Sequence, residues 1–88
     1  MKLLNSTFDV CVPFDTTILE VSLVYNEGWC VVARVNERKY KMATYPIKEA
    51  AQQDLMNLLT YSNEYQNAFG RLPPYYIFGK VEVETSDS

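Results

Sequence analysis

The stretch that decides the fold runs from Thr16 to Phe69 and reads TTILEVSLVYNEGWCVVARVNERKYKMATYPIKEAAQQDLMNLLTYSNEYQNAF. Its pattern predicts a strand, a tight turn, a strand, a second turn, a strand and then one long helix. The segments before and after it alternate in polarity, which predicts further strands of the same sheet. We therefore predict an α+β fold in which one long helix packs on one face of an antiparallel sheet of four to five strands.

Three strands are predicted inside this stretch. Residues 18–25 alternate between apolar and polar side chains, as in a half-buried strand. Residues 29–35 are apolar on both faces, which is typical of a central strand. Residues 39–44 carry lysines on the outward face and predict an edge strand, because edge lysines discourage pairing with another chain. The loop between the first two strands ends at Gly28, which we expect to adopt the left-handed backbone conformation.

The helix is the best-defined element of the sequence. Pro46 suits a first helical turn, since its missing N–H would have no partner there. Gly70 predicts the C-cap, and the proline pair that follows prevents continuation. A stripe at steps of three and four residues predicts the buried side: Ala51, Leu55, Leu58, Ser62, Tyr65 and Phe69. With the strand faces, this predicts one core that includes Leu55, Leu58, Val21, Leu23, Val31 and Ile77.

Two flanking segments complete the predicted sheet. Residues 8–12 alternate in polarity before Pro13 ends the strand. Residues 75–84 read as the longest strand, with Tyr75 and Ile77 on the core side. The other side of that strand would expose two aromatic rings next to charged side chains. Residues 85–88 form a polar tail, and residues 1–88 as a whole predict a single domain.

The charge of the chain narrows the classes of function. The net charge is −3, so the long-range field disfavours non-specific binding to nucleic acid or to membranes. Residues 34–48 are an exception, because five cations face one acid there and give a local charge of +4. A basic patch at the second turn therefore stays open as a contact for phosphate.

The sequence offers little for catalysis or metal binding. Histidine is absent, which removes the commonest general base and the commonest metal ligand. Cys11 and Cys30 are too few for a structural zinc site. We expect no enzyme, no cofactor and no metal, and two reduced thiols packed as small apolar groups, although a disulfide between neighbouring strands stays open. The chain shows neither a secretion signal nor an apolar run long enough to span a membrane, which predicts a cytoplasmic protein.

One part of the chain resembles a known family of inhibitors. The runs VYNEG at 24–28 and ARVN at 33–36, followed by a Leu-rich helix up to Leu59, resemble a small phage-encoded anti-CRISPR family. The resemblance covers about a third of the chain. It implies an antiparallel sheet with helical structure, and a role in blocking a CRISPR surveillance complex through surface contacts.

A second resemblance points to nucleic acid. The run VVARVN at 31–36, followed by KEAA at 48–51, is similar to the sheet and second helix of a double-stranded-RNA-binding domain. The leading helix of that family is replaced here by strand patterns. Its basic cluster at the start of the second helix is reduced to Lys48, with Glu49 and Asp54 following, which puts phosphate binding in doubt.

These observations favour a small acidic protein-binding module, interpreted as a phage or mobile-element inhibitor that blocks a host defence complex. Its partner would be a host protein, for example one with a basic nucleic-acid-binding surface. The predicted strand at residues 75–84 carries two aromatics and two carboxylates on one face, which are the properties of a hot spot. With one outward acid of the strand at residues 18–25, the predicted partner contacts are Tyr76, Phe78, Glu82, Glu84 and Glu20. A dimer mate or the N-terminal strand covering that face stays open. The alternative is nucleic-acid binding through Arg38, Lys39, Lys41 and Lys48.

Overall fold

The strand β4, from Gly28 to Val35, lies at the centre of a three-stranded antiparallel sheet in the computed structural model, which describes residues 1–79. Its neighbours are β3 (Ile18–Val24) and β5 (Arg38–Tyr45). Four consecutive residues of β4, from Cys30 to Ala33, are buried. The predicted central strand and the predicted edge strand with lysines are therefore both confirmed.

A second three-stranded sheet has the order β2-β1-β6. β1 (Lys2–Leu4) pairs antiparallel with β2 (Cys11–Pro13) and parallel with β6 (Tyr75–Ile77). The α+β class with a single helix is confirmed, but residues 1–79 form two small sheets in place of the one predicted sheet of four to five strands. β1 escapes sequence recognition because three residues are too few to show a period of two.

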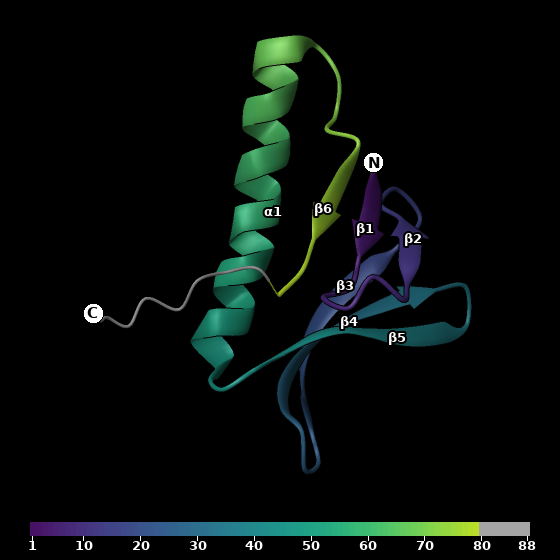
Figure 1. Ribbon diagram of the computed structural model, residues 1–88, viewed down its shortest axis with the longest axis vertical. Coiled ribbons are helices and arrows are strands. Elements are labelled where there is room, and N and C mark those ends of the chain that lie inside the picture. Colours follow the sequence, from purple (N-terminus) through teal and green to yellow (C-terminus); the bar gives the residue numbers. More distant parts are fainter. Residues whose placement is uncertain (80–88) are drawn as a thin grey trace.

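The single helix of the described residues, α1, runs from Lys48 to Phe69. It ends at Gly70, whose φ is +75° and whose N–H donates to the carbonyl of Gln66 at 2.8 Å, so the predicted C-cap is confirmed. Pro46 precedes the helix by two residues and does not lie in its first turn, because Ile47 is extended and forms the N-cap. Figure 1 shows the N-terminal end of α1 meeting β5 and its upper half standing beside β6.

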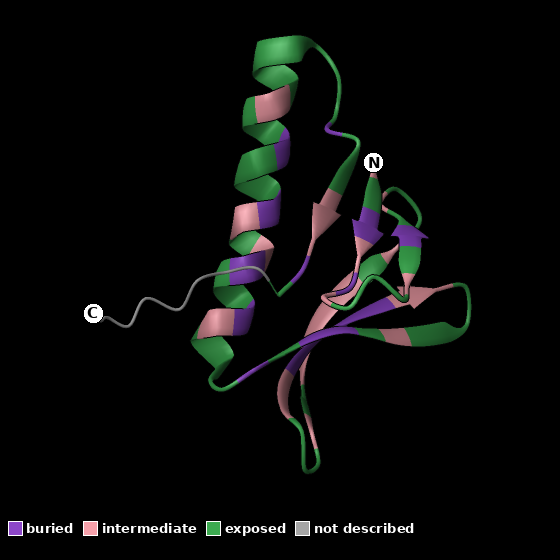
Figure 2. Cartoon of the chain, viewed as in Figure 1, coloured by how far each residue is buried: buried purple, intermediate pink, exposed green. Residues whose placement is uncertain are grey.

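Both sheets and the helix contribute to one core. β1 provides Leu3, β4 provides Val31 and Ala33, and α1 provides Ala51 and Leu58. Figure 2 shows the buried residues of α1 on the side that faces β6 and the sheets. The N–H of Ser6, just after β1, donates to the carbonyl of Met42 on β5 at 3.1 Å. This hydrogen bond links the two sheets.

The predicted core is correct in its centre and wrong at one end. Val31 and Leu58 are buried, Val21 and Leu55 are partly buried against the core, and Ile77 is half-buried. Leu23 is 64% exposed, since the tip of the β3–β4 hairpin projects beyond the helix (Figure 1).

The predicted strand at residues 8–12 is confirmed only at residues 11 and 12, which belong to β2, whereas residues 8–10 form a loop. The side-chain Oδ1 of Asn5 accepts hydrogen bonds from the N–H groups of Asp9 and Val10, at 2.8 and 2.9 Å. Phe8 has a φ of +63° inside this loop. Asn side chains that bond nearby backbone groups compete with strand pairing, which explains the difference from the sequence pattern.

Candidate functional site

Tyr76 and Phe78, predicted as an exposed aromatic pair, are turned into the molecule. Phe78 is fully buried, and the ring of Tyr76 lies 5.2 Å from it, centroid to centroid. The prediction of an exposed pair is therefore wrong. Tyr76 lies within β6, and Tyr75, which was predicted on the core side, is 51% exposed, so the sequence pattern assigned the core to the wrong face of this strand. The strand ends at Ile77, because the next two residues form a turn and Gly79 has a φ of +84°. The predicted contacts Glu82 and Glu84 lie outside the described residues, as does the rest of the predicted strand.

Tyr76 is held by a buried carboxylate that the sequence did not single out. Asp54, in the N-terminal third of α1, is fully buried and accepts hydrogen bonds from three donors. The hydroxyl of Tyr76 donates to its Oδ1, and the hydroxyl of Tyr45 donates to its Oδ2. The N–H of Gly79 also donates to Oδ2, at 2.8 Å. We call these four residues the Asp54 cluster, and it ties α1 to β5, to β6 and to the turn after β6.

The Asp54 cluster changes the acid–base behaviour of its two tyrosines. Burial raises the pKa of Tyr45 and of Tyr76 well above the ordinary value, and the hydrogen bond to Asp54 raises both further. Both phenols therefore stay protonated and keep donating to the carboxylate throughout the physiological range. The cluster is closed to solvent at Asp54, and we assign it a structural role.

A row of aromatic rings runs from the Asp54 cluster along the C-terminal half of α1. The ring of Tyr61 lies 6.1 Å from that of Tyr76 and 5.9 Å from that of Tyr65. Tyr65 in turn lies 4.6 Å from Phe69. Phe69 is 62% exposed and Tyr75, on β6, is 51% exposed. We call the three rings of this row on α1, together with two exposed apolar residues that follow the helix, the aromatic surface: Tyr61, Tyr65, Phe69, Leu72 and Tyr75.

A hollow lies at the centre of the aromatic surface. Within residues 1–79 its lining consists of Tyr61 from α1 with Tyr75, Tyr76 and Ile77 from β6, none of which is charged. Phe69 belongs to the stripe that the sequence predicts as buried. It is exposed because the helix extends past the described strands at this end, so no element covers its last turn (Figure 1).

The open face of the sheet β3-β4-β5 brings together residues that the sequence assigned to two different functions. Glu20, a predicted partner contact, lines one hollow with Lys39 and Lys41, which were assigned to nucleic acid. Glu27 joins them and forms a salt bridge with Lys41. This salt bridge raises the pKa of Lys41. We call this region, with Arg34 of β4, the charged sheet face.

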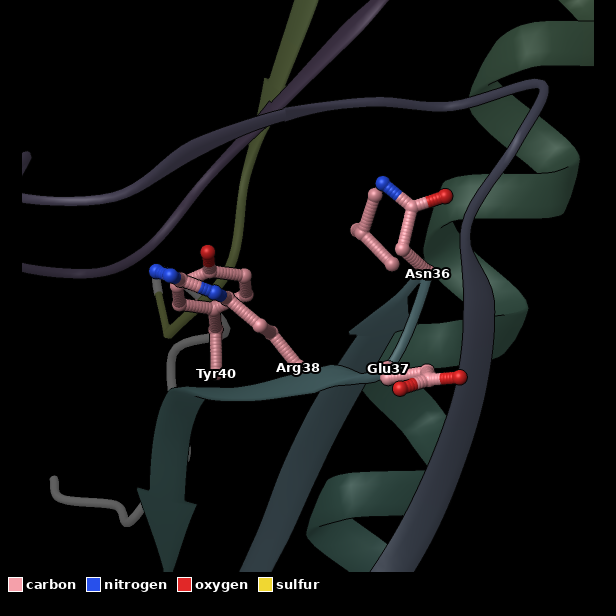
Figure 3. Close-up of a pocket in the computed structure, with 5 residues that line it drawn as sticks. Asn36, Glu37, Arg38 and Tyr40 are labelled. Atoms are coloured by element: carbon pink, nitrogen blue, oxygen red, sulfur yellow. The ribbon is translucent and has the colours of Figure 1, made fainter.

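The remaining predicted phosphate contacts lie elsewhere. Arg38 and Tyr40 point to one side of β5, at a hollow formed with Asn36 and Glu37 at the hairpin tip (Figure 3). This is the opposite side of β5 from Lys39, since neighbouring strand residues face opposite ways. The ammonium group of Lys48 lies 5.4 Å from the centre of the Trp29 ring. The structure therefore distributes the four predicted cations over three separate places.

The two thiols are separated and differ in environment. Cys11 is exposed and Cys30 is buried, and neither forms a disulfide. Burial raises the pKa of the Cys30 thiol. Within residues 1–79 there is no group of three or more acidic or cysteine side chains arranged to hold a metal ion. No helix in this part of the chain is long and apolar enough to cross a membrane.

Asp54 and the row of aromatic rings were not predicted as site residues, but their spacing in the sequence indicates their positions. Asp54 lies three residues after Ala51 and four before Leu58, so the helical period places its carboxylate on the buried side. A charged residue in that position requires partners, and tyrosine hydroxyls are suitable donors. The aromatic row shows in the four-residue spacing of Tyr61, Tyr65 and Phe69.

We compared the chain with protein-family models, with curated proteins and with solved structures, and none of the three comparisons found a match.

Proposed function

We propose that this chain is a protein-binding module whose contact surface is the aromatic surface of α1 and β6. The observation that carries the proposal is the row of three rings in mutual contact, from exposed Tyr61 through half-buried Tyr65 to exposed Phe69, beside a hollow whose lining within residues 1–79 carries no charge. Aromatic side chains supply most of the energy at protein interfaces, where they bury a large area at low cost in conformational entropy. The partner is a protein segment that presents apolar side chains to this hollow.

The geometry supports this surface because its base is rigid. Tyr76 forms one wall of the hollow, and its hydroxyl is fixed by Asp54. Tyr61 forms the opposite wall from a helix that is anchored in the core through Leu58. A hollow with preorganised walls loses little conformational entropy when a partner binds.

Binding to nucleic acid has weaker support than binding to protein. The four predicted cations lie in three places, and Lys41 is engaged by Glu27. A polyanion needs several cations along one path, while the net charge of −3 repels it at long range. The nucleic-acid alternative therefore stays a prediction from the sequence.

The finer interpretation is a phage or mobile-element inhibitor of a host defence complex, acting in the cytoplasm. It depends on the resemblance in residues 24–59 and on the small, acidic chain. Glu82 and Glu84 remain predicted contacts of that interpretation, and the absence of catalysis also stays a prediction.

An affinity purification with matched variants tests the proposed surface. The tagged chain is incubated with host lysate, treated with nuclease, and its partners are identified by mass spectrometry. Phe69→Ser removes an apolar side chain that is 62% exposed, and Leu23→Ser removes one that is 64% exposed on the hairpin tip. We expect a nuclease-resistant partner that is lost with Phe69→Ser and kept with Leu23→Ser.

Two outcomes would contradict the proposed contact surface. A partner kept by Phe69→Ser and by Tyr75→Ser, in variants that unfold at the temperature of the original chain, would show that the aromatic surface is not the contact. Loss of every partner on nuclease treatment would favour the nucleic-acid alternative.

A further inference from the structure

Arg34, on the charged sheet face, has a buried donor without an acceptor. Its Nε is shielded from solvent and makes no hydrogen bond within the described residues. A buried, unsatisfied donor on a charged group is rare in proteins, because it loses its hydration without compensation. Arg34 as a whole is only half-buried, so its guanidinium group still reaches the surface.

A second cation lies directly beside Arg34. Lys39 on β5 is the register partner of Arg34, and Ile18 on β3 is its partner on the other side. Directly opposed residues of an antiparallel pair project on the same face, with Cβ atoms about 4.5–5.5 Å apart. Neither Arg34 nor Lys39 forms a salt bridge in the part of the chain that the structure describes. Two adjacent cations without a counter-charge mark a place that favours an anion.

The neighbouring residues determine which anion fits. Glu20 pairs with Val32 in the adjacent row of the sheet, and Glu27 lies in the same hollow. These carboxylates repel a continuous polyanion such as a nucleic-acid strand. A single carboxylate can bind, because it has to contact only Arg34 and Lys39 and does not extend into the adjacent row that contains Glu20. Exposed Ile18, the partner of Arg34 on β3, then offers apolar contact in the same row.

We infer that Arg34 and Lys39 form a binding site for one carboxylate side chain of an acidic segment from a partner protein. The two terminal nitrogens of the planar guanidinium, which reach the surface, donate to the carboxylate through parallel N–H groups, and the Lys39 ammonium adds a third donor. The site lies on the face of β3-β4-β5 that is turned away from the core, and it is independent of the aromatic surface.

NMR of the ¹⁵N-labelled full chain tests the site, because Arg Nε–H signals can be followed individually. The chain has three arginines, so Arg38 and Arg71 serve as internal references. The probe is a capped peptide with one glutamate between β-branched residues, and the control is the same peptide with glutamine. We expect the Nε–H of Arg34 to shift with the glutamate peptide alone, and the signals of Arg38 and Arg71 to stay in place.

Variants distinguish binding at this site from non-specific electrostatic attraction between the peptide and the protein. Lys39→Gln should weaken the peptide response by about tenfold, as expected for one charge-assisted contact, while Lys48→Gln at the Trp29 ring should leave it unchanged. Equal shifts at all three arginines, or no shift at Arg34, would overturn the site. So would a stronger response of Arg34 to a single-stranded oligonucleotide than to the peptide. A shift of Arg34 in the free Glu20→Gln variant would show that Glu20 already supplies the acceptor, and would overturn it too.

Discussion

The hydroxyl of Tyr76, on β6, donates to the carboxylate of Asp54 in the N-terminal third of α1, although the two residues are 22 positions apart in the sequence. The same hydroxyl lies 3.2 Å from the backbone carbonyl of Asp54. Through this relationship the strand that closes the second sheet is fixed against the helix. It also fixes the ring of Tyr76, which lines the aromatic hollow, beside the ring of Tyr61.

Replacing Asp54 by Ala should destabilise the protein strongly. The change leaves the hydroxyls of Tyr45 and Tyr76 and the N–H of Gly79 without their acceptor. We expect a loss of about 3–5 kcal/mol in the free energy of unfolding, measured by urea denaturation. Tyr76→Phe removes one donor only and should cost about 1.5–3 kcal/mol. Equal, small losses for both variants would contradict the central role of the carboxylate.

Alkaline pH should destabilise the fold through the same cluster. The pKa of Tyr45 and of Tyr76 is raised in the folded state, so the folded protein binds these protons more tightly than the unfolded chain does. Their contribution to stability is therefore complete below about pH 10, the ordinary tyrosine pKa, and is lost as the pH rises further. Each buried phenol should lower the free energy of unfolding by up to about 1.4 kcal/mol per pH unit above that point.

Urea denaturation between neutral pH and pH 11 measures this slope, and Tyr76→Phe is the control, since it should make the slope shallower. Lys41, whose pKa is raised by its salt bridge with Glu27, contributes in the same direction, but this salt bridge is exposed and is screened by added salt. A slope in Tyr76→Phe that equals that of the original chain would exclude Tyr76 as a cause.

Two neighbouring leucines of α1 should differ sharply. Leu58 is 1% exposed in the core, whereas Leu59 is 50% exposed. Leu58→Ala should cost about 2–5 kcal/mol, since it leaves a cavity, and Leu59→Ala should change stability by less than about 1 kcal/mol. Thermal and urea unfolding measure both, and similar losses would mean that the buried stripe of the helix is wrongly assigned.

Gly79→Ala should be more damaging than Gly70→Ala. Both glycines have positive φ, +84° and +75°, so an added Cβ strains the backbone at either position. A Cβ on Gly79 would also lie 2.7 Å from the Cβ of Ser6, whereas at Gly70 no atom of the described residues beyond its chain neighbours lies within 4 Å. We expect about 1–2 kcal/mol for Gly70→Ala from strain alone, and a larger loss for Gly79→Ala. Equal losses would show that the contact with Ser6 relaxes without cost.

The two cysteines should react at different rates with a thiol reagent. Cys11 is exposed, whereas Cys30 is buried and its pKa is raised, so its reactive thiolate is both rarer and less accessible. In the native protein we expect one fast and one slow thiol by absorbance, with the fast phase absent in Cys11→Ser. Cys11→Ser and Cys30→Ser should both retain binding apart from any loss of stability, and loss of binding in a folded variant would contradict a purely structural role.

Much of the fold could be predicted from local sequence. The apolar run of β4 identifies a central strand, because such a strand buries both faces. Gly28 and Gly70 mark a hairpin and a helix end, since each adopts a positive φ that other residues avoid. These features depend on residues that are close together in the sequence, so they can be predicted from the sequence alone.

The arrangement of the candidate surfaces was decided by tertiary structure alone. The side of β6 that was predicted to face solvent packs inward, because Asp54 accepts a hydrogen bond from Tyr76 and Phe78 is buried in the core. On the opposite face, sheet register places Arg34 beside Lys39. Periodicity gives the side of an element on which a residue lies, whereas the partner on that side is set by long-range packing. The amino-acid sequence by itself thus determined the strands, the helix and its ends, and only the folded chain decided which side chains meet and which stay exposed.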